Sequence, residues 1–255
     1  MILLSKHNLK VVKTNLWRSR HAMKIMHLSP STSSGFGNTC GRETIGCKDS
    51  CFRNSGFFLL KHVQSAHDFK TEWFFKEPSS FGPVLLGECI SHQYESLRDG
   101  RKPVIRLNGT SDIAWEEDLP EVFERCPDTQ FFDYTKHFSR MLRFVGGIAA
   151  GSSSSTGRGF PANYHLTFSR SENNWIDCED VLDIGGNVAV VFEEKPETYG
   201  GYPVIDGDKH DLRFLDDSPR IVGLTPKGKA RIDMTGFRVR RDMLPKGYTP
   251  LSITK

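Results

Sequence analysis

The chain contains 255 residues, of which 37% are hydrophobic and 25% are charged, and its formal net charge is +3. This length and composition exclude wholesale disorder, and a charge this small does not by itself indicate nucleic-acid binding. Six cysteines are too few for a disulfide scaffold, and the sequence has no secretory signal and no apolar run of about 18 residues. We therefore expect one domain over residues 1–255 that is soluble and cytoplasmic, with no membrane partner.

The N-terminal part of the chain leads to its one cluster of cysteines. Residues 1–22 are expected to form a strand or an N-terminal arm, and residues 24–28 a first strand. A loop rich in serine, glycine and threonine then leads to Cys40, Cys47 and Cys51. Thiols this close in sequence can converge on a metal, with zinc and an iron-sulfur cluster as alternatives. Their spacing matches neither a zinc ribbon nor the usual motif of radical enzymes, and inert buried cysteines are the competing interpretation.

The middle of the chain predicts a βαβ unit whose strands end in polar residues. Apolar spacing predicts helices over residues 52–68 and 81–97. An apolar run at 104–108 is typical of a buried parallel strand, a helix is expected at 119–126, and the next strand at 130–135. Strand, helix and strand within about 30 residues form a βαβ unit, which brings both strand ends to the same edge of the sheet.

The second half of the chain repeats this design. Residues 138–150 predict a helix, and the low-complexity loop at 151–160 is expected to be mobile and to be a lid or an insertion, not a domain boundary. Further strands are predicted at 163–168, 187–192 and 220–224, with a short helix near 178–182. Parallel strands that all end in polar residues are typical of TIM-type barrels and doubly wound sheets. We predict an α/β fold, a single (β/α) barrel of the TIM type in complete, incomplete or irregular form.

The candidate site is the set of polar side chains at these strand ends. Its carboxylates are Asp112, Asp133, Asp206 and Asp208. Carboxylates in one partly buried site can act as nucleophile, general base or reader of N–H donors, because like charges push their pKa values apart. The residues expected to contact the substrate are Asn108, Ser111, Lys136, Ser169, Arg170 and Asp206. The two cations among them can bind a phosphate or balance the carboxylates.

Other motifs in the sequence narrow the choice of function. The basic turn with Lys227, Lys229 and Arg231 is either a nucleic-acid-binding surface or a solvated face. The acidic run at 206–211 lacks the spacing and closing glutamate of a calcium loop, and we interpret it as a turn. The sequence has no nucleophile elbow, Walker loop or dinucleotide-binding glycine motif, which disfavours serine hydrolysis, nucleotide hydrolysis and nicotinamide redox chemistry.

Six blocks of sequence, taken in order, resemble a family of bacteriophage proteins, the gene product 88 group. The blocks are residues 106–112 with Trp115 and Glu116, 132–136, 163–169, 187–192, 204–208, and 222–224 with 227–230. The resemblance spans residues 24–237. The wider group is linked to DpdA-like relatives of tRNA-guanine transglycosylase. A phage protein of this kind would work in the cytoplasm of the host cell.

The resemblance implies a transferase, a DNA transglycosylase that exchanges guanine for a 7-deazaguanine base through a covalent aspartyl intermediate. The base would be 7-cyano-7-deazaguanine or a derivative, and the target guanine would have to leave the DNA stack. Asp112 matches the most recognisable aspartate of the group and is the first catalytic candidate, followed by Asp133. Asp208, like Asp206, is a candidate nucleophile by position. The late Cys-x-Cys-x-x-Cys zinc motif of tRNA-guanine transglycosylases is missing, so the early cysteines would have to hold any structural metal.

Two other functions remain compatible with the sequence. An iron-sulfur, radical-type or other metal-dependent enzyme would use Cys40, Cys47 and Cys51 as ligands. A non-catalytic protein that binds nucleic acid or a host factor would depend on the basic turn and not on Asp112.

Overall fold

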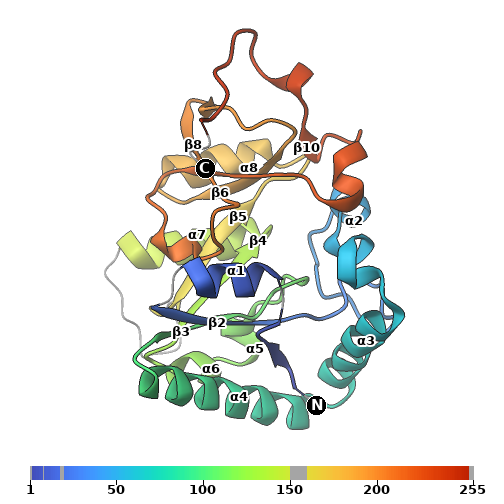
Figure 1. Cartoon of the computed structure of the whole chain (residues 1–255), viewed down its shortest axis with the longest axis vertical. Helices are drawn as coiled ribbons and strands as arrows, with labels where there is room; N and C mark the ends of the chain where they lie inside the picture. Colours follow the sequence, from blue (N-terminus) through green and yellow to red (C-terminus); the bar gives the residue numbers. More distant parts are fainter. Residues whose placement is uncertain (1, 8, 18–19, 150–159, 253–255) are drawn as a thin grey trace.

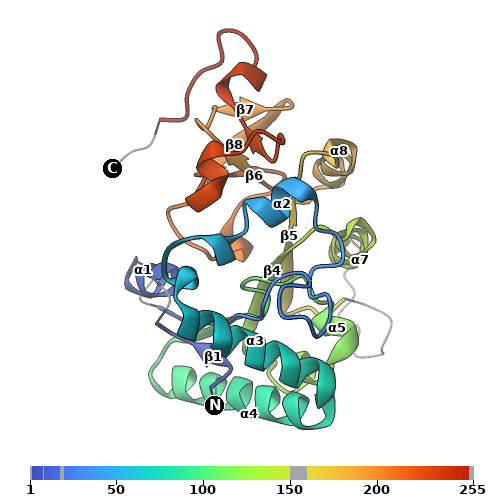
Figure 2. The ribbon, with the colours of Figure 1, turned by 90° about the vertical axis from the view of Figure 1, so that its right-hand side faces the viewer.

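The computed structural model describes residues 2–7, 9–17, 20–149 and 160–252, and strands alternate with helices along most of them (Figures 1 and 2). The strands are β1 (Leu4–Ser5), β2 (His21–Met26), β3 (Lys102–Arg106), β4 (Gln130–Thr135), β5 (Tyr164–Ser169), β6 (Val188–Phe192), β7 (Thr198–Tyr199), β8 (Tyr202–Asp206), β9 (Ile221–Leu224) and β10 (Arg238–Val239). The α-helices are α1 (Leu9–Trp17), α2 (Ile45–Asp49), α3 (Lys61–Lys76), α4 (Pro78–Arg98), α5 (Trp115–Asp118), α6 (Glu121–Glu124), α7 (Phe138–Ala149) and α8 (Trp175–Asp183). Short 3₁₀ helices are η1 (Phe52–Asn54), η2 (Gly56–Leu59), η3 (Arg213–Leu215), η4 (Gly228–Ile232) and η5 (Arg241–Met243).

The strands pair into one open sheet. Its order in the described residues is β1-β2-β3-β4-β5-β6-β9-β8-β7, and β10 pairs with β6 beyond the end of β5. Every pair from β2 to β8 is parallel, whereas the two-residue edge strands β1 and β7 are antiparallel. The predicted α/β class is therefore confirmed. A TIM barrel is not confirmed, because β1 and β7 end the sheet at opposite edges and leave it unclosed.

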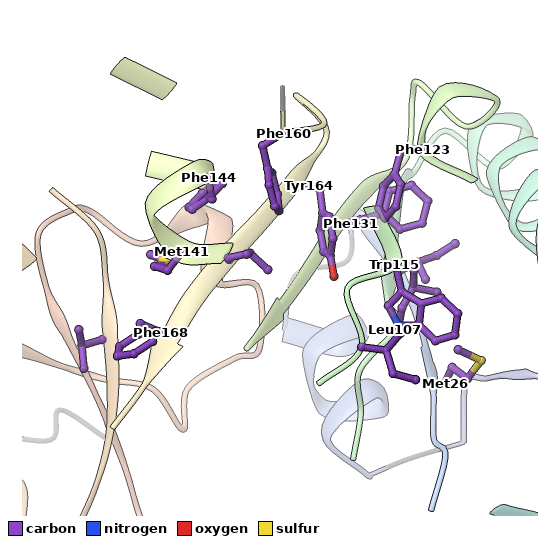
Figure 3. Close-up of a cluster of buried hydrophobic side chains, with 14 of the residues drawn as sticks. Met26, Leu107, Trp115, Phe123, Phe131, Met141, Phe144, Phe160, Tyr164 and Phe168 are labelled. Carbon is purple, nitrogen blue, oxygen red and sulfur yellow. The ribbon is translucent and has the colours of Figure 1, made fainter. Parts of the chain in front are cut away.

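Both faces of the sheet are buried, as expected for parallel strands. Successive residues of β4 point to opposite faces, so Phe131 and Phe132 belong to different apolar clusters. Phe131 packs with Phe123 at a ring-centre distance of 4.8 Å in the larger cluster, part of which Figure 3 shows. Phe132 lies 6.0 Å from Phe214 on the other face. Neighbouring residues of β4 therefore pack into different halves of the core.

Two predicted helices differ from the structure. The helix expected at 52–68 is replaced by η1, η2 and the start of α3, because Gly56 has a positive φ of 55°, which does not fit inside a continuous right-handed α-helix. The helix expected at 119–126 is shorter in the structure, where α6 covers only residues 121–124 and the separate turn α5 precedes it at 115–118. Pro120 disfavours a helical conformation at the residue before it, and Leu119 accordingly has φ −144°. Pro83 lies inside α4 and not in its first turn, which begins at Pro78.

For residues 1–28 and for the predicted loop at 151–160, the predictions can be compared with the structure only at the described residues. Residues 4–5 and 9–17 form β1 and α1, and the strand expected at 24–28 is β2. The predicted mobile loop at 151–160 lies outside the described residues except for Phe160, which is buried and packs on Tyr164 at a ring-centre distance of 5.3 Å.

Candidate functional site

A cavity of about 210 Å³ lies where the parallel strands end. Its walls are the residues that follow several strands, together with two segments that cover the strand ends, residues 40–52 and 225–237. The residues predicted from the sequence that line it are Cys40, Cys47, Cys51, Asn108, Ser111, Asp112, Lys136, Ser169, Arg170, Asp208 and Lys227. The ends of distant strands are thus brought to one cavity, as the parallel arrangement requires.

Four predicted site residues do not line this cavity. Asp133 lies inside β4 and is fully buried, and Asp206 ends β8 with its carboxylate 2.5 Å from Lys195 Nζ. Lys229 and Arg231 are exposed on η4, next to the wall of the cavity.

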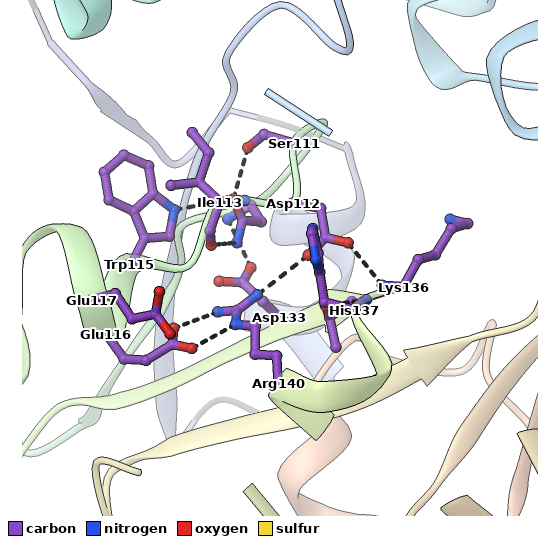
Figure 4. A network of polar contacts seen from close by, with 12 residues as sticks. Ser111, Asp112, Ile113, Trp115, Glu116, Glu117, Asp133, Lys136, His137 and Arg140 are labelled. Carbon is purple, nitrogen blue, oxygen red and sulfur yellow. Dashed lines mark hydrogen bonds and ion pairs between the residues drawn. The ribbon is translucent and has the colours of Figure 1, made fainter. Parts of the chain in front are cut away.

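Asp112 is held at the wall of the cavity by contacts to both of its carboxylate oxygens (Figure 4). Oδ2 accepts a hydrogen bond from the backbone N–H of Lys136 at 2.7 Å, and Oδ1 lies 3.2 Å from Arg140 Nη1. The side chain is 11% exposed. Asp112 also lines a second cavity of about 510 Å³, whose walls include Phe74, Phe75 and Phe81. These contacts fix the carboxylate in one orientation between two cavities.

Arg140, on α7, holds this carboxylate in place. Its guanidinium binds Glu116 through two bonds, Nε to Oε1 and Nη2 to Oε2, both 2.8 Å long, and Nη2 also donates to the Tyr164 hydroxyl at 2.7 Å. Burial alone would lower the pKa of the guanidinium, but Tyr164, Glu116 and Asp112 raise it by more, so the net pKa is above its ordinary value. Arg140 is therefore a permanent buried cation beneath the site.

Asn108 and Asp133 shape the turn that carries Asp112. Asn108 is 2% exposed, and its Oδ1 accepts hydrogen bonds from Ser111 Oγ at 2.8 Å and from Trp115 Nε1 at 3.0 Å. Asp133 Oδ1 accepts from the backbone N–H of Asn108 at 2.7 Å, and Oδ2 accepts from the Tyr164 hydroxyl at 2.7 Å. The side-chain oxygen of Asn108 is therefore used within the turn itself. Asp133 holds the start of the turn through the backbone N–H of Asn108.

The titration of Asp133 gives a testable pH dependence. Burial raises the pKa of this carboxyl to about 7, although Arg106 and the Tyr164 hydroxyl oppose the shift. The folded protein then binds a proton at pH values where the unfolded chain, with a pKa near 3.8, has released it, so stability should fall as pH rises from 4 to 7. We expect Asp133→Asn to remove this fall, which is about 4 kcal/mol at about 1.4 kcal/mol per pKa unit.

Urea denaturation at several pH values from 4 to 8 measures the free energy of unfolding for both proteins. If the two curves run parallel, Asp133 does not titrate in this range.

Asp208 is another carboxylate that lines the cavity. Its Oδ2 lies 2.7 Å from Lys195 Nζ and accepts from the backbone N–H of Thr225 at 2.8 Å, while Oδ1 is 3.8 Å from Lys227 Nζ. Burial opposes ionisation, but these hydrogen bonds outweigh it and lower the pKa of Asp208 to about 2. Asp208 is therefore an anion at neutral pH, with one oxygen held and the other directed toward an exposed lysine.

Several residues of the site were missed by the sequence-based prediction. They are Arg140, Glu116, Tyr164, Lys195, Arg106 and Asp211. Lys195 follows β6 and so obeys the strand-end pattern, which could have identified it. Arg140 lies on a helix and finds its partners 24 and 28 residues away, at Glu116 and Asp112. No local pattern marks such a contact.

The three cysteines of the early cluster all line the cavity, whereas Cys89 and Cys126 are buried in the apolar core. Burial raises the pKa of the Cys40 thiol to about 11 and raises that of Cys51 as well. The Cys47 thiol lies near the Lys136 ammonium group and helps to raise its pKa. Among the described residues, no group of three or more His, Cys, Asp or Glu side chains is arranged to hold a metal ion. The metal site therefore stays a prediction.

The segment with the cysteines is fixed over the cavity by Glu172 and by the chain near residue 235. Glu172 accepts hydrogen bonds from the Thr44 hydroxyl at 2.6 Å and from the backbone N–H of Gly46 at 2.8 Å. A Cβ atom on Gly46 would lie 2.2 Å from Thr235 Oγ1 and 2.7 Å from Phe237 Cβ. Only glycine permits this close approach of the two segments that cover the strand ends.

Gly46→Ala should separate these two segments. We expect the free energy of unfolding to fall by about 1–3 kcal/mol, because the added methyl group forces its neighbours apart. Gly87→Ala, in α4, is the matched control because its Cβ would meet nothing within 4 Å, so it should be neutral or stabilising by up to about 1 kcal/mol. Thermal denaturation of both variants measures the difference, and equal melting temperatures would contradict the tight packing at Gly46.

An open, mainly parallel sheet with a cavity beyond the carboxyl ends of its strands places the protein in the α/β class, in which that edge of the sheet is the usual location of a binding site. Residues 2–241 match the family model described as Gene product 88, and the chain belongs to this family. The phage protein family expected from the sequence blocks is thereby confirmed. A search of curated proteins found no match, and a search of solved structures also found none. No helix in the described part of the chain has the length and apolar character needed to cross a membrane.

Proposed function

We propose that the protein is a transglycosylase that replaces guanine in DNA with a 7-deazaguanine base. The observation that carries the proposal is the meeting of two carboxylates from distant strands, Asp112 after β3 and Asp208 after β8, in one cavity. Exchange of a base through a covalent intermediate needs a nucleophile and an acid/base group at the same sugar. The family resemblance implies a (β/α) barrel, whereas the sheet is open, so the proposal rests on the carboxylates at the strand ends and not on a closed barrel.

The two carboxylates are suited to different roles. Asp208 is ionised, and its Oδ1 is not held by the hydrogen bonds that fix Oδ2, so we assign it as nucleophile. Its oxygen forms a bond to C1′ of the deoxyribose while the C1′–N9 bond of guanine breaks. Asp112 serves as acid/base: in its protonated form it gives a proton to the departing guanine, and the resulting carboxylate then removes the N9 proton of the incoming base, which restores the protonated form. That base then attacks C1′, and the Asp208 carboxylate is released.

The rim of the cavity carries the charges expected for a DNA partner. Lys229 and Arg231 are exposed on η4, and Lys227 reaches the cavity itself. Cations that bind phosphates release counterions, so affinity for DNA should fall steeply with salt, by about a factor of ten per phosphate contact for a tenfold rise in salt concentration. Fluorescence anisotropy with a labelled duplex at several salt concentrations measures this slope. Absent binding, or binding that does not change with salt, would contradict a DNA substrate.

Mass spectrometry of nucleosides tests the proposed reaction. DNA is incubated with the protein and 7-cyano-7-deazaguanine, digested to nucleosides, and examined for the deazaguanine deoxynucleoside and for released guanine. The wild-type protein should form the deazaguanine deoxynucleoside and release guanine in equal amounts. The surface control Asp242→Asn, whose side chain is 68% exposed, should give the same result. DNA binding without either product, across a panel of deazaguanine bases, would instead favour a non-catalytic binding protein.

A second candidate is a metal-dependent or iron-sulfur enzyme, and it is favoured by the position of Cys40, Cys47 and Cys51 in the same cavity. Thiolates are suitable ligands for zinc and for iron-sulfur clusters, which would supply Lewis-acid or electron-transfer chemistry when bound. The three thiols are not gathered around one point in the structure, so we derive no step from a metal.

Anaerobic purification tests this candidate. Brown protein that contains iron and sulfide, and that loses both in Cys47→Ser, would support a cluster. Colourless protein without metal would exclude one.

A further inference from the structure

Two cations, Lys136 and Arg170, lie at neighbouring strand ends in the cavity. They follow β4 and β5, which pair in parallel through Thr135 and Phe168, and both side chains line the cavity. Both also contact Phe237: the Lys136 ammonium is 5.9 Å from the centre of its ring, and Arg170 Nη1 donates to its carbonyl oxygen at 2.9 Å. Their shared neighbour places the two positive groups on one wall of the cavity.

These two cations differ from the others in the cavity because neither has a carboxylate partner. Arg106 Nη1 is 3.0 Å from Asp211, and Lys227 Nζ is 3.8 Å from Asp208. No ion pair within 4.0 Å joins Lys136 or Arg170 to a carboxylate anywhere in the described residues. Arg170 is only 7% exposed. A charge this well buried is unfavourable without a counter-charge, so the site is suited to receive an anion.

Unused hydrogen-bond donors lie at the same place. Arg170 Nε and the Ser50 hydroxyl are buried and have no hydrogen-bond partner, and both residues line the cavity. Buried donors without a partner are rare in folded proteins. The other side of the Arg170 guanidinium is fixed, because Nη1 donates to the carbonyl oxygens of Gly236 and Phe237 at 2.5 and 2.9 Å. The guanidinium is thus oriented by the protein while one of its N–H groups is left for a ligand.

Lys136 is charged in this setting. Burial lowers the pKa of its ammonium group, but Cys47 and Asp112 raise it by more, and the net pKa is above the ordinary lysine value.

We propose that Lys136 and Arg170 form a subsite for a phosphate group, with the Ser50 hydroxyl as an additional donor. An oriented guanidinium beside an ammonium group suits the several oxygens of a phosphate, because each cation can bind a different one. The assignment of this phosphate to DNA rests on the proposed function: a nucleotide in DNA carries a phosphate next to the sugar whose base would be exchanged. Binding of the phosphate would fix the sugar between Asp112 and Asp208.

Isothermal titration calorimetry with three small ligands tests the subsite without requiring turnover. The ligands are deoxyguanosine 5′-monophosphate, deoxyguanosine and inorganic phosphate. We expect the nucleotide to bind at least about tenfold more tightly than the nucleoside, since hydrogen bonds to charged groups are the strong ones. Inorganic phosphate should compete with the nucleotide. Equal affinities for nucleotide and nucleoside would overturn the subsite.

Variants assign the effect to the two cations. Lys136→Gln and Arg170→Gln should each reduce the preference for the nucleotide by about tenfold, and Arg170→Lys should retain part of it. Lys102→Gln is the control, because this exposed lysine lies at the opposite end of β3. Circular dichroism establishes that each variant is folded. A preference that survives both glutamine substitutions would place the phosphate elsewhere.

The outcomes separate the subsite from the proposed reaction. Preference for the nucleotide without any base exchange would retain the phosphate subsite and reject the transglycosylase. Base exchange by a protein that binds nucleotide and nucleoside equally would reject the subsite alone.

Discussion

Replacing Arg140 with methionine is expected to lower the free energy of unfolding by about 3–5 kcal/mol, the range found when one partner of a buried ion pair is removed. The guanidinium is 2% exposed and is shared by Glu116, which is 5% exposed, and Asp112, which is 11% exposed. Methionine fills a similar volume, so most of the loss should come from two carboxylates left without a cation. The Tyr164 hydroxyl would also lose its hydrogen bond to Arg140.

Arg143→Met is the matched control for this variant. Arg143 lies one turn further along α7 and also contacts Glu116, at 3.5 Å, but its side chain is 50% exposed. Exposed ion pairs contribute about 0–1 kcal/mol, so this substitution should have little effect. Urea denaturation of the two variants gives the comparison. Similar losses for both would mean that the buried network around Arg140 adds little to stability.

The sequence was most informative about the positions of the strands. It was less informative about the helices between them and about the closure of the sheet. Apolar runs predicted the strands at 130–135, 163–168, 187–192 and 220–224, because a strand buried on both faces has a local signature. Helix boundaries were predicted less accurately: Gly56 interrupts the segment at 52–68, and Pro120 excludes Leu119 from the helix expected at 119–126, although apolar spacing alone predicts a helix over both segments. Whether the sheet closes depends on pairing between its edges, which no local pattern encodes.

The same division holds for the candidate site. Polar residues just after strands, such as Asp112 and Lys136, were correctly expected near one edge, because parallel strands share a direction. Asp133 was grouped with them although it lies inside β4, where a side chain faces the core and not the cavity. Arg140 was not found, because the partners of a buried ion pair are chosen by tertiary contact and not by sequence spacing.

Asp208→Asn is expected to lower the rate of base exchange by at least about 10³-fold, as expected for loss of a catalytic nucleophile. It should also abolish the covalent protein–DNA adduct that the aspartyl mechanism forms. The assignment depends on the different bonding of the two carboxylates. Both carboxylate oxygens of Asp112 accept hydrogen bonds, one from the Lys136 N–H and one from Arg140. In Asp208, the hydrogen bonds from Lys195 and Thr225 both go to Oδ2 and not to Oδ1. An oxygen that must form a bond to C1′ cannot be fully occupied by other partners.

Incubation with DNA in the absence of an incoming base, followed by denaturing electrophoresis, detects the adduct directly. Asp206→Asn is a close control: this residue shares Lys195 with Asp208, two positions away, but does not line the cavity, so its variant should still form the adduct. Asp112→Asn should form the adduct slowly, because the departing guanine then lacks its proton donor. Formation of the adduct by Asp208→Asn but not by Asp112→Asn would reverse the two roles. No adduct with the wild-type protein, under conditions where exchange proceeds, would rule out a covalent aspartyl intermediate and leave direct displacement at C1′ as the route.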